Sequence, residues 1–276
     1  MKKIVLGFYL MIAAVCYSKV ERVVSGLPSI TEIIIDMGEE KKIVGTDSYS
    51  SKLEEIDDDL SIMNTNNINE EKILELNPDL VLVSSHNLYK GKGSLELLKE
   101  FGIKVEVLNK IEKLDDIEKE IDKIGLLMEV KDKSDRLKEE YIKRLKVIKD
   151  KKENYTKKPR VYIEISSQPL YTTGAGTFIN DVVTVAGGEN VFSDKNGWIS
   201  PSVEELLVKD PEIIFISQKN KEQFLENIKN RPELKDSSAV KNGKVYVLDE
   251  KIVRPSVRVI GGIENMSKII EEYNQD

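Results

Sequence analysis

Residues 131–152 read KDKSDRLKEEYIKRLKVIKDKK, and this stretch decides how the rest of the chain is organised. It contains neither Gly nor Pro, and its apolar residues recur every three or four positions: Leu137, Tyr141, Leu145 and Ile148. This spacing places them on one narrow helical face, while the other faces are charged. At about 1.5 Å per residue the helix would span about 30 Å, the diameter of a small domain. The stretch therefore predicts a strut that contacts folded material along one side only.

Two similar segments flank the strut. Residues 71–84 read EKILELNPDLVLVS, and residues 204–217 read EELLVKDPEIIFIS. They align without a gap, and each predicts a short helix, a Pro stop and a buried strand of the parallel type. We therefore expect two similar lobes, residues 19–130 and 157–276, joined by a linking helix within residues 131–156.

The first eighteen residues are typical of a secretory signal peptide. Lys2 and Lys3 precede the apolar run Ile4–Val15, which is too short for a membrane-spanning helix with flanks. We expect cleavage after Ser18 and a periplasmic protein. The alternatives are a retained N-terminal anchor and a lipid anchor at Cys16, although the bulky Val15 fits a lipoprotein signal poorly.

The composition of the chain excludes some classes of partner and site. The 276 residues are 40% hydrophobic and 33% charged, with a net charge of −7, which argues against nucleic acid and anionic membranes as partners. Cys16 is the single cysteine, so the chain after the leader has no disulfide and depends on core packing. A single His argues against zinc and manganese sites, which use several His with carboxylates.

Short strands and helices alternate along both halves of the chain. This order predicts an α/β fold with two mainly parallel sheets, each covered on both faces. Ser29 and Glu32 predict a capping box for a helix over residues 30–37, while residues 85–93 and 166–176 read as loops. Ligands of parallel sheets lie beyond the C-terminal strand ends, so such loops would form the walls of a cleft between the lobes.

The order and spacing of several motifs resemble the periplasmic substrate-binding proteins of ABC importers for iron chelates and cobalamin. The motifs are RVVSGLPSITE (22–32), the loop of Tyr49, NPDLVL (77–82), TGAGTF (173–178), AGGENV (186–191) and GW (197–198). The resemblance covers residues 19–276 and implies two α/β lobes bridged by one helix. It also implies a monomeric, non-enzymatic protein without a cofactor, which binds a metal chelate between its lobes. Its partners would be an inner-membrane permease and the ATPase of that permease.

The bound ligand is expected to be a ferric siderophore or haem, with cobalamin as the alternative. Cobalamin binders of this type often carry extra Trp residues in the loops of the first lobe. The corresponding residues 64–67 and 84–85 of this chain are polar, which favours the iron chelates.

Glu71 and Glu204 hold equivalent positions near the N-termini of the two repeated helices. An acid there is favoured by the helix dipole whatever the function. The resemblance implies a sharper role, in which each lobe presents one exposed Glu to a basic pocket of the permease. Since exposed ion pairs contribute only about 0–1 kcal/mol each, orientation and encounter rate are the expected roles.

Tyr49, Tyr171 and Trp198 lie on polar segments, where an aromatic ring packs locally or stacks on a flat ligand. The resemblance implies that Tyr49 and Trp198 contact the ligand. It also implies that Arg254 reaches the ligand, where a guanidinium would suit the anionic oxygens of a ferric chelate. We expect Arg258 to form an ion pair within its own lobe.

His86 and Tyr89 are candidate iron ligands only if the chelate is haem; otherwise His86 is an exposed loop residue. Gly174-Ala-Gly176 lacks the third Gly and the distant acid of a dinucleotide site, and it is more typical of a turn that lines a ligand.

An exported α/β hydrolase is the second functional class considered. The chain has no Gly-x-Ser-x-Gly elbow, no His pair and no cysteine after the leader, so no catalytic residue is predicted. A scaffold or adhesion protein would leave the aromatic loops and the matched glutamates unexplained.

Overall fold

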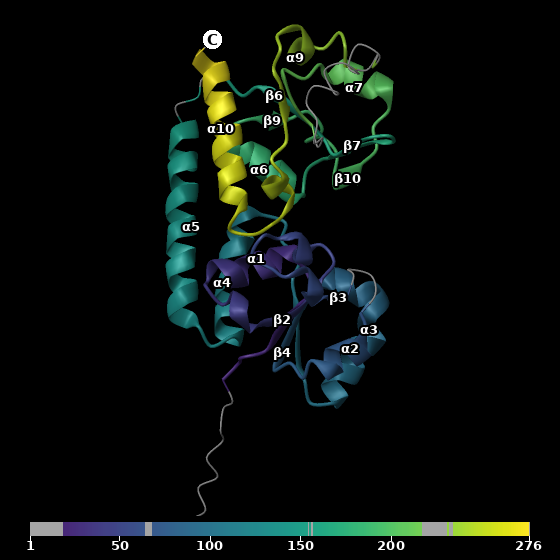
Figure 1. The fold of residues 1–276 in the computed structure, drawn as a ribbon. Helices are drawn as coiled ribbons and strands as arrows, with labels where there is room; N and C mark the ends of the chain where they lie inside the picture. The colour runs from purple at the N-terminus through teal and green to yellow at the C-terminus, as the bar shows by residue number, and fades with distance from the viewer. Residues whose placement is uncertain are drawn as a thin grey trace, which may run out of the picture.

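The computed structural model describes residues 19–63, 68–153, 155, 157–216, 231 and 234–275, and it leaves the side chains of residues 86–90 undescribed. The expected signal peptide with Cys16 therefore lies outside the described residues. Two lobes are stacked along one long helix, with the N-terminal lobe lower in the view of Figure 1.

The N-terminal lobe is built on a parallel sheet with strand order β3-β2-β1-β4-β5. Its strands are β1 (Val23–Ser25), β2 (Ile43–Asp47), β3 (Ser61–Met63), β4 (Leu80–Ser84) and β5 (Lys104–Leu108). Its α-helices are α1 (Pro28–Asp36), α2 (Glu70–Glu75), α3 (Ser85–Glu100) and α4 (Leu114–Leu127), with short 3-10 turns η1 (Glu40–Lys42), η2 (Ser50–Lys52) and η3 (Asp58–Leu60). The inner strand β4, which pairs with β1 and β5, is buried along its whole length, as its run of apolar residues predicts.

The C-terminal lobe combines a parallel sheet of order β12-β11-β6-β9 with a small antiparallel sheet of order β10-β8-β7. Its strands are β6 (Arg160–Glu164), β7 (Ser166–Ser167), β8 (Leu170–Thr173), β9 (Glu189–Asn190), β10 (Trp198–Ile199), β11 (Ile213–Ile216) and β12 (Val245–Val247). Its described helices are α6 (Phe178–Ala186), α7 (Val203–Lys209), α9 (Ser238–Lys241), the 3-10 helix η5 (Glu250–Val253) and α10 (Val259–Gln275). The predicted α/β class with two mainly parallel sheets is confirmed.

The linking helix α5 spans Lys131–Lys152, as its sequence predicts. It runs beside both lobes (Figure 1) and packs against α4 of the first lobe and against α6 and α10 of the second. Tyr141, Leu145 and Ile148 are buried along this face, and the Tyr141 hydroxyl donates to the carbonyl of Leu114 (3.1 Å). The strut is therefore fixed to both lobes by one apolar stripe.

The two repeated segments fold alike. Helix α2 is capped by the side chain of Asn69, and helix α7 by that of Ser202, each accepting a hydrogen bond from a backbone N–H three residues on. After each helix the backbone turns through a residue at positive φ, Asn77 (44°) and Asp210 (38°), residue types that tolerate this region. A Pro and a buried strand follow in both copies.

The duplication extends to contacts that lie outside the aligned segments. The guanidinium of Arg22 donates to the carbonyl of Leu76 (2.7 and 3.0 Å), and its backbone N–H donates to Asp79 (2.8 Å). In the second lobe the guanidinium of Arg160 donates in the same way to the carbonyl of Asp210 (2.8 and 3.0 Å). In each lobe an arginine at the start of the first strand, directly before β1 or as the first residue of β6, therefore holds the end of the repeated helix.

The loop predicted over residues 85–93 is wrong, because α3 begins directly after β4 at Ser85. Gly91 and Gly93 suggested a loop, yet Gly91 is buried inside this helix. A Cβ at Gly91 would overlap the side chain of Ile68, so this glycine allows a close approach between α3 and the segment before α2. His86 and Tyr89 are therefore helical residues.

The predicted capping box at Ser29 is also wrong. Helix α1 begins at Pro28, and its N-cap residue Leu27 makes no side-chain capping bond. The carboxylate of Glu32 is buried and instead accepts hydrogen bonds from Arg254 and Ser256. A contact with the other lobe therefore takes the place of the local cap.

Candidate functional site

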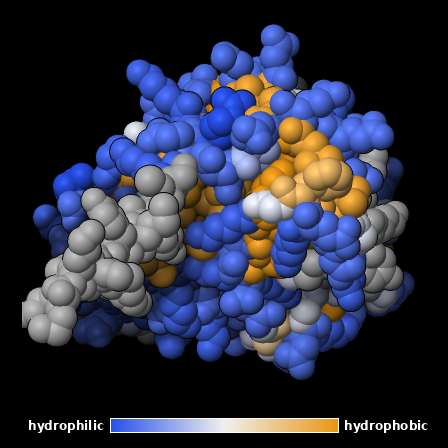
Figure 2. Space-filling model, turned by 90° about the horizontal axis from the view of Figure 1, so that it is seen from below, coloured by the Kyte–Doolittle hydropathy of each residue, from blue (hydrophilic) through white to orange (hydrophobic). Residues whose placement is uncertain are grey.

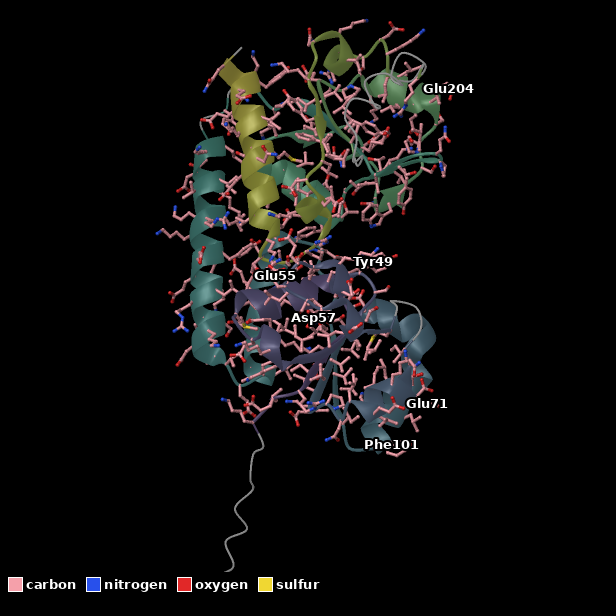
Figure 3. The ribbon with its side chains drawn as sticks, viewed as in Figure 1. Tyr49, Glu55, Asp57, Glu71, Phe101 and Glu204 are labelled. Carbon is pink, nitrogen blue, oxygen red and sulfur yellow. The ribbon has the colours of Figure 1, made fainter. Side chains whose placement is uncertain are left out.

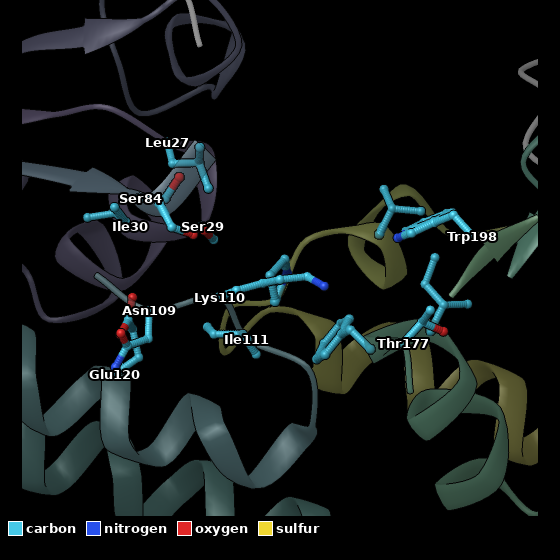
Figure 4. A pocket seen from close by; sticks show the side chains of 15 residues that line it. Leu27, Ser29, Ile30, Ser84, Asn109, Lys110, Ile111, Glu120, Thr177 and Trp198 are labelled. Carbon is cyan, nitrogen blue, oxygen red and sulfur yellow. The ribbon is translucent and has the colours of Figure 1, made fainter. Parts of the chain in front are cut away.

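A pocket of about 260 Å³ lies between the two lobes. Figure 4 shows that both lobes line it, with Ser29 and Ser84 on the side of the N-terminal lobe and Thr177 and Trp198 on the other. Its wall in the N-terminal lobe comes from the start of α1, the β4–α3 junction, the segment after β5, and α4. This is the edge at the C-terminal ends of parallel strands, where ligands of α/β sheets bind.

A stacked aromatic pair stands at this pocket. Trp198 on β10 lines it, and the ring of Tyr171 on β8 lies parallel to the indole, with a centroid distance of 5.7 Å and an interplanar angle of 11°. The two strands pair antiparallel, with Trp198 opposite Thr173. Both rings are partly exposed, by 45% for Trp198 and 37% for Tyr171. The sequence suggested polar loops here, whereas a small sheet holds both rings in place.

Tyr49 follows β2 on the first lobe, at its side facing the second lobe (Figure 3), and its side chain is 58% exposed. It does not line the 260 Å³ pocket. The ammonium of Lys52 lies over its ring, 5.6 Å from the centroid. The buried carboxylate of Asp47 accepts hydrogen bonds from the backbone N–H groups of Tyr49 (3.2 Å) and Ser50 (3.1 Å). Asp47 therefore fixes the turn that presents this tyrosine.

Arg254 lies beside the pocket, but its charge is engaged by the other lobe. Its guanidinium donates to Glu32 (2.9 Å), which is 1% exposed. Its neighbours Val253 and Pro255 line the pocket, whereas Arg254 does not. The guanidinium is still 32% exposed, so it joins the lobes and keeps one side accessible.

Arg258 does not pair within its own lobe, contrary to our expectation. It donates to Asp36 and to Glu55, each at 2.8 Å, and both acids belong to the N-terminal lobe. The hydrogen bond from Arg258 lowers the pKa of Glu55. The segment before α10 thus makes three ion pairs across the lobe boundary, one from Arg254 and two from Arg258.

Glu71 and Glu204 occupy the second position after the caps of α2 and α7, and both are exposed. Figure 3 places them on the side of the molecule away from α5, one on each lobe. Hydrogen bonds from its own backbone N–H and from Ser202 lower the pKa of Glu204. Each lobe therefore presents one acid at an equivalent helix terminus.

Residues 23–252 match the family model described as periplasmic binding protein. The chain belongs to the periplasmic binding protein family. An ABC transporter substrate-binding lipoprotein of Bacillus subtilis is 30% identical over 257 residues, which cover 91% of this chain and 80% of that protein. The vitamin B12-binding protein of Yersinia pestis is 28% identical over 201 residues, covering 71% of this chain and 69% of that one.

Solved structures of the family have the same fold. A possible iron-binding periplasmic protein of Staphylococcus epidermidis superposes with a TM-score of 0.80 at 28% identity, covering 91% of this chain and 99% of that one. The periplasmic vitamin B12-binding protein of Vibrio cholerae gives a TM-score of 0.80 at 25% identity, with 94% and 99% coverage. This periplasmic binding protein is thus a non-enzymatic, extracytoplasmic substrate-binding protein of an ABC transporter, which implies a permease as its partner.

Two charged residues that line the pocket of this binding protein were not predicted from the sequence. Glu120 on α4 is 8% exposed and lines the pocket, and burial raises its pKa to about 7. Lys110 also lines the pocket, with its ammonium 3.1 Å from the exposed Glu112. The available signal for Glu120 was its position, three residues after Ile117 and four before Ile124, on the apolar face of α4.

The side chains of His86 and Tyr89 lie outside the described residues, so the structure does not place these candidate iron ligands. Among the residues that are described, three or more His, Cys, Asp or Glu side chains do not gather into a metal site. Over the same part of the chain, every helix is too short or too polar to cross a membrane.

Proposed function

We propose that this binding protein captures an iron chelate, a ferric siderophore or haem, between its lobes and delivers it to an inner-membrane permease and the ATPase of that permease. The observation that carries this proposal is the stacked pair Tyr171–Trp198 at a pocket lined by both lobes. A flat or aromatic chelate stacks on such a platform at little entropic cost. A corrinoid such as cobalamin is the second candidate, and the two vitamin B12-binding relatives support it.

The pocket favours the smaller chelates. Its 260 Å³ lies below the roughly 300–1,000 Å³ of typical small-molecule sites, so a large ligand would have to extend beyond it, toward Tyr49. Ser84 and Ser85 line the wall at the β4–α3 junction, where polar hydroxyls suit the oxygen-rich surface of a siderophore.

We assign ligand contacts to Trp198, Tyr171 and Tyr49, with Arg254 contributing the side of its guanidinium that Glu32 leaves accessible. If the chelate is haem, His86 or Tyr89 would ligate its iron, and otherwise these two residues have no assigned role.

Permease docking is assigned to Glu71 and Glu204. Leu207 and Val208 follow Glu204 by three and four residues, so they lie on the same face of α7, and they are 44% and 85% exposed. On the first lobe Phe101, labelled below Glu71 in Figure 3, is 65% exposed. Acids accompanied by exposed apolar side chains are suited to a docking surface.

The face of the molecule seen from below is mostly polar (Figure 2). Figure 2, which views the molecule from below, shows hydrophilic residues over most of the face and hydrophobic residues in a limited area. A limited apolar area suits transient docking better than a permanent interface, and we infer a monomer.

For the remaining organisation we propose a signal peptide over residues 1–18, lobes over 19–130 and 157–276, and a linking segment over 131–156. Cleavage after Ser18 would release a soluble periplasmic protein. The Bacillus subtilis relative is described as a lipoprotein, which supports the alternative of lipid attachment at Cys16.

Thermal unfolding of the chain from Lys19 onward, with and without candidate ligands, tests the function. A ligand present at one hundred times its dissociation constant should add about 2.7 kcal/mol to the free energy of unfolding. The panel is a set of ferric siderophores, haemin and cyanocobalamin. Stabilisation by a siderophore or haemin supports the proposal, whereas stabilisation by cyanocobalamin alone would replace it with the corrinoid alternative.

A further inference from the structure

The carboxyl group of Glu120 has an unusual place in the molecule. The residue lies on α4 with 8% of its surface exposed and lines the pocket between the lobes, where Figure 4 shows it near Asn109. Among the described residues it has no hydrogen-bond or ion-pair partner. The other buried residues of this face are Leu114, Ile117, Ile121, Ile124 and Gly125. An acid therefore stands where packing alone would favour an apolar side chain.

Several charged groups on α4 and on the elements around it are engaged elsewhere. Lys123, one turn further along α4, attracts the carboxylate, but its ammonium lies 2.6 Å from Glu106 on β5. Lys110 on the segment after β5 pairs with Glu112. On α1, Glu32 accepts from Arg254 and Ser256 of the other lobe. On α6, Asp181 accepts from the backbone N–H of Leu114 (2.9 Å). The described part of the chain thus leaves the Glu120 oxygens without a donor.

A largely buried carboxyl without a donor destabilises the free protein, because it loses part of its hydration without gaining a hydrogen bond. Such a group is stabilised when a ligand supplies the missing donor. The other residues that line this pocket supply hydroxyl, amide and apolar groups and the ammonium of Lys110, so Glu120 is the acidic contact among them. Burial, which raises its pKa to about 7, also leaves a carbonyl oxygen as acceptor when the group is protonated.

We propose that Glu120 is a specificity-determining residue, which accepts a hydrogen bond from an N–H donor on the bound chelate. This rests on the proposed placement of the ligand in the pocket between the lobes. The donor is an ammonium or a primary amide on the periphery of the ligand. An amine-bearing ferric hydroxamate supplies the first and an amide-rimmed corrinoid the second, whereas the peripheral polar groups of haem are carboxylates. The residue therefore favours the first two over haem.

The inference is tested with three probes: ferrioxamine B, which carries an ammonium, cyanocobalamin, which carries primary amides, and haemin. Their affinities are measured by titration calorimetry for the chain from Lys19 onward and for Glu120→Leu and Glu118→Leu. Glu118 is a neighbouring acid of α4 without a place in the pocket lining, so Glu118→Leu is the matched control. We expect Glu120→Leu to weaken the probe with the N–H donor at least tenfold and to raise the melting temperature of the ligand-free protein.

Weaker ligand binding together with a higher melting temperature of the free Glu120→Leu protein separates a role in ligand recognition from a structural role. A change in affinity below twofold, an equal loss for haemin, or a lower melting temperature of the free Glu120→Leu protein would each overturn the inference. Binding of haemin alone, or of none of the three probes, also contradicts it. The probe that responds to Glu120→Leu identifies the source of the donor, ammonium or amide.

A third variant, Trp198→Ala, distinguishes this inference from the proposed ligand site. If Trp198→Ala weakens binding and Glu120→Leu does not, the ligand occupies the pocket without using the carboxyl, and only the role of Glu120 fails. If Trp198→Ala leaves the affinity unchanged, the ligand lies elsewhere, and both proposals fail.

Discussion

The two lobes share one frame but carry different additions. Strands β2-β1-β4-β5 of the first lobe and β9-β6-β11-β12 of the second follow the same spatial order, and Arg22 and Arg160 hold the repeated helices in the same way. The first lobe adds β3, whereas the second adds the antiparallel strands β7, β8 and β10. The shared frame carries the outward acids Glu71 and Glu204, while the addition to the second lobe carries Tyr171 and Trp198. Duplication thus produced a symmetric outer surface, and divergence produced an asymmetric pocket.

The largest expected effect concerns the symmetric surface. Glu71→Ala combined with Glu204→Ala should abolish ligand uptake by cells that carry the transporter, because each lobe loses its acidic contact with the permease. Ligand affinity measured on the purified protein should stay unchanged, and each single variant should reduce uptake only partly. Loss of ligand affinity in the double variant would show that the two glutamates act on ligand binding, and it would refute the assignment of docking to the outer surface.

The next effect concerns the contact between the lobes. Arg254→Ala leaves the buried carboxylate of Glu32 without its charged donor, and we expect a loss of about 3 kcal/mol in the free energy of unfolding. Urea denaturation measures it. Arg144→Ala is the matched control, since its pair with Glu264 is about 40% exposed on both sides and should contribute less than about 1 kcal/mol. Equal losses in the two variants would mean that Glu32 is solvated in solution.

A smaller effect is expected from the pH dependence of stability. Because the pKa of Glu120 is raised to about 7 in the fold from 4.5, the folded protein binds more protons than the unfolded chain between these values. The contribution of this group to stability is complete below about pH 4.5 and declines as the pH rises through 7. Relative to Glu120→Gln, the wild type should lose about 2 kcal/mol between pH 5 and 8. If the free energies of unfolding of the wild type and of Glu120→Gln change with pH in parallel, the carboxyl is hydrated in the folded protein.

The smallest effect concerns the addition to the second lobe. Trp198→Ala removes both the indole and its stack on Tyr171, and we expect a loss of about 1–2 kcal/mol in binding free energy, or roughly 5–30-fold in affinity. Phe101→Ala removes an exposed ring on the other lobe, outside the pocket lining, and should leave the affinity unchanged. Similar losses in both variants would indicate that aromatic residues act through stability rather than through the ligand.

Local patterns in the sequence were sufficient for the frame and insufficient for the pocket. The apolar stripe of α5 and the repeated Pro-strand segments determine their own conformation, so the two lobes and the strut could be predicted. Gly91 suggested a loop because the sequence does not show that Ile68 lies against it. The pairing of Trp198 with Thr173 joins strands that are 25 positions apart in the chain, and the contacts of Arg258 with Asp36 join the two lobes. Such features depend on the packed structure and have no local signal.

The way in which α5 is fixed to both lobes has a consequence for which cargo can be carried. A helix has a constant rise of about 1.5 Å per residue and resists stretching, so it holds the gap between the lobes at a nearly constant width. We therefore expect selection by size, in which chelates thicker than the gap are rejected because the protein cannot widen to admit them. Release would then require mechanical work from the transporter, since we expect the loaded protein to differ little in shape from the empty one.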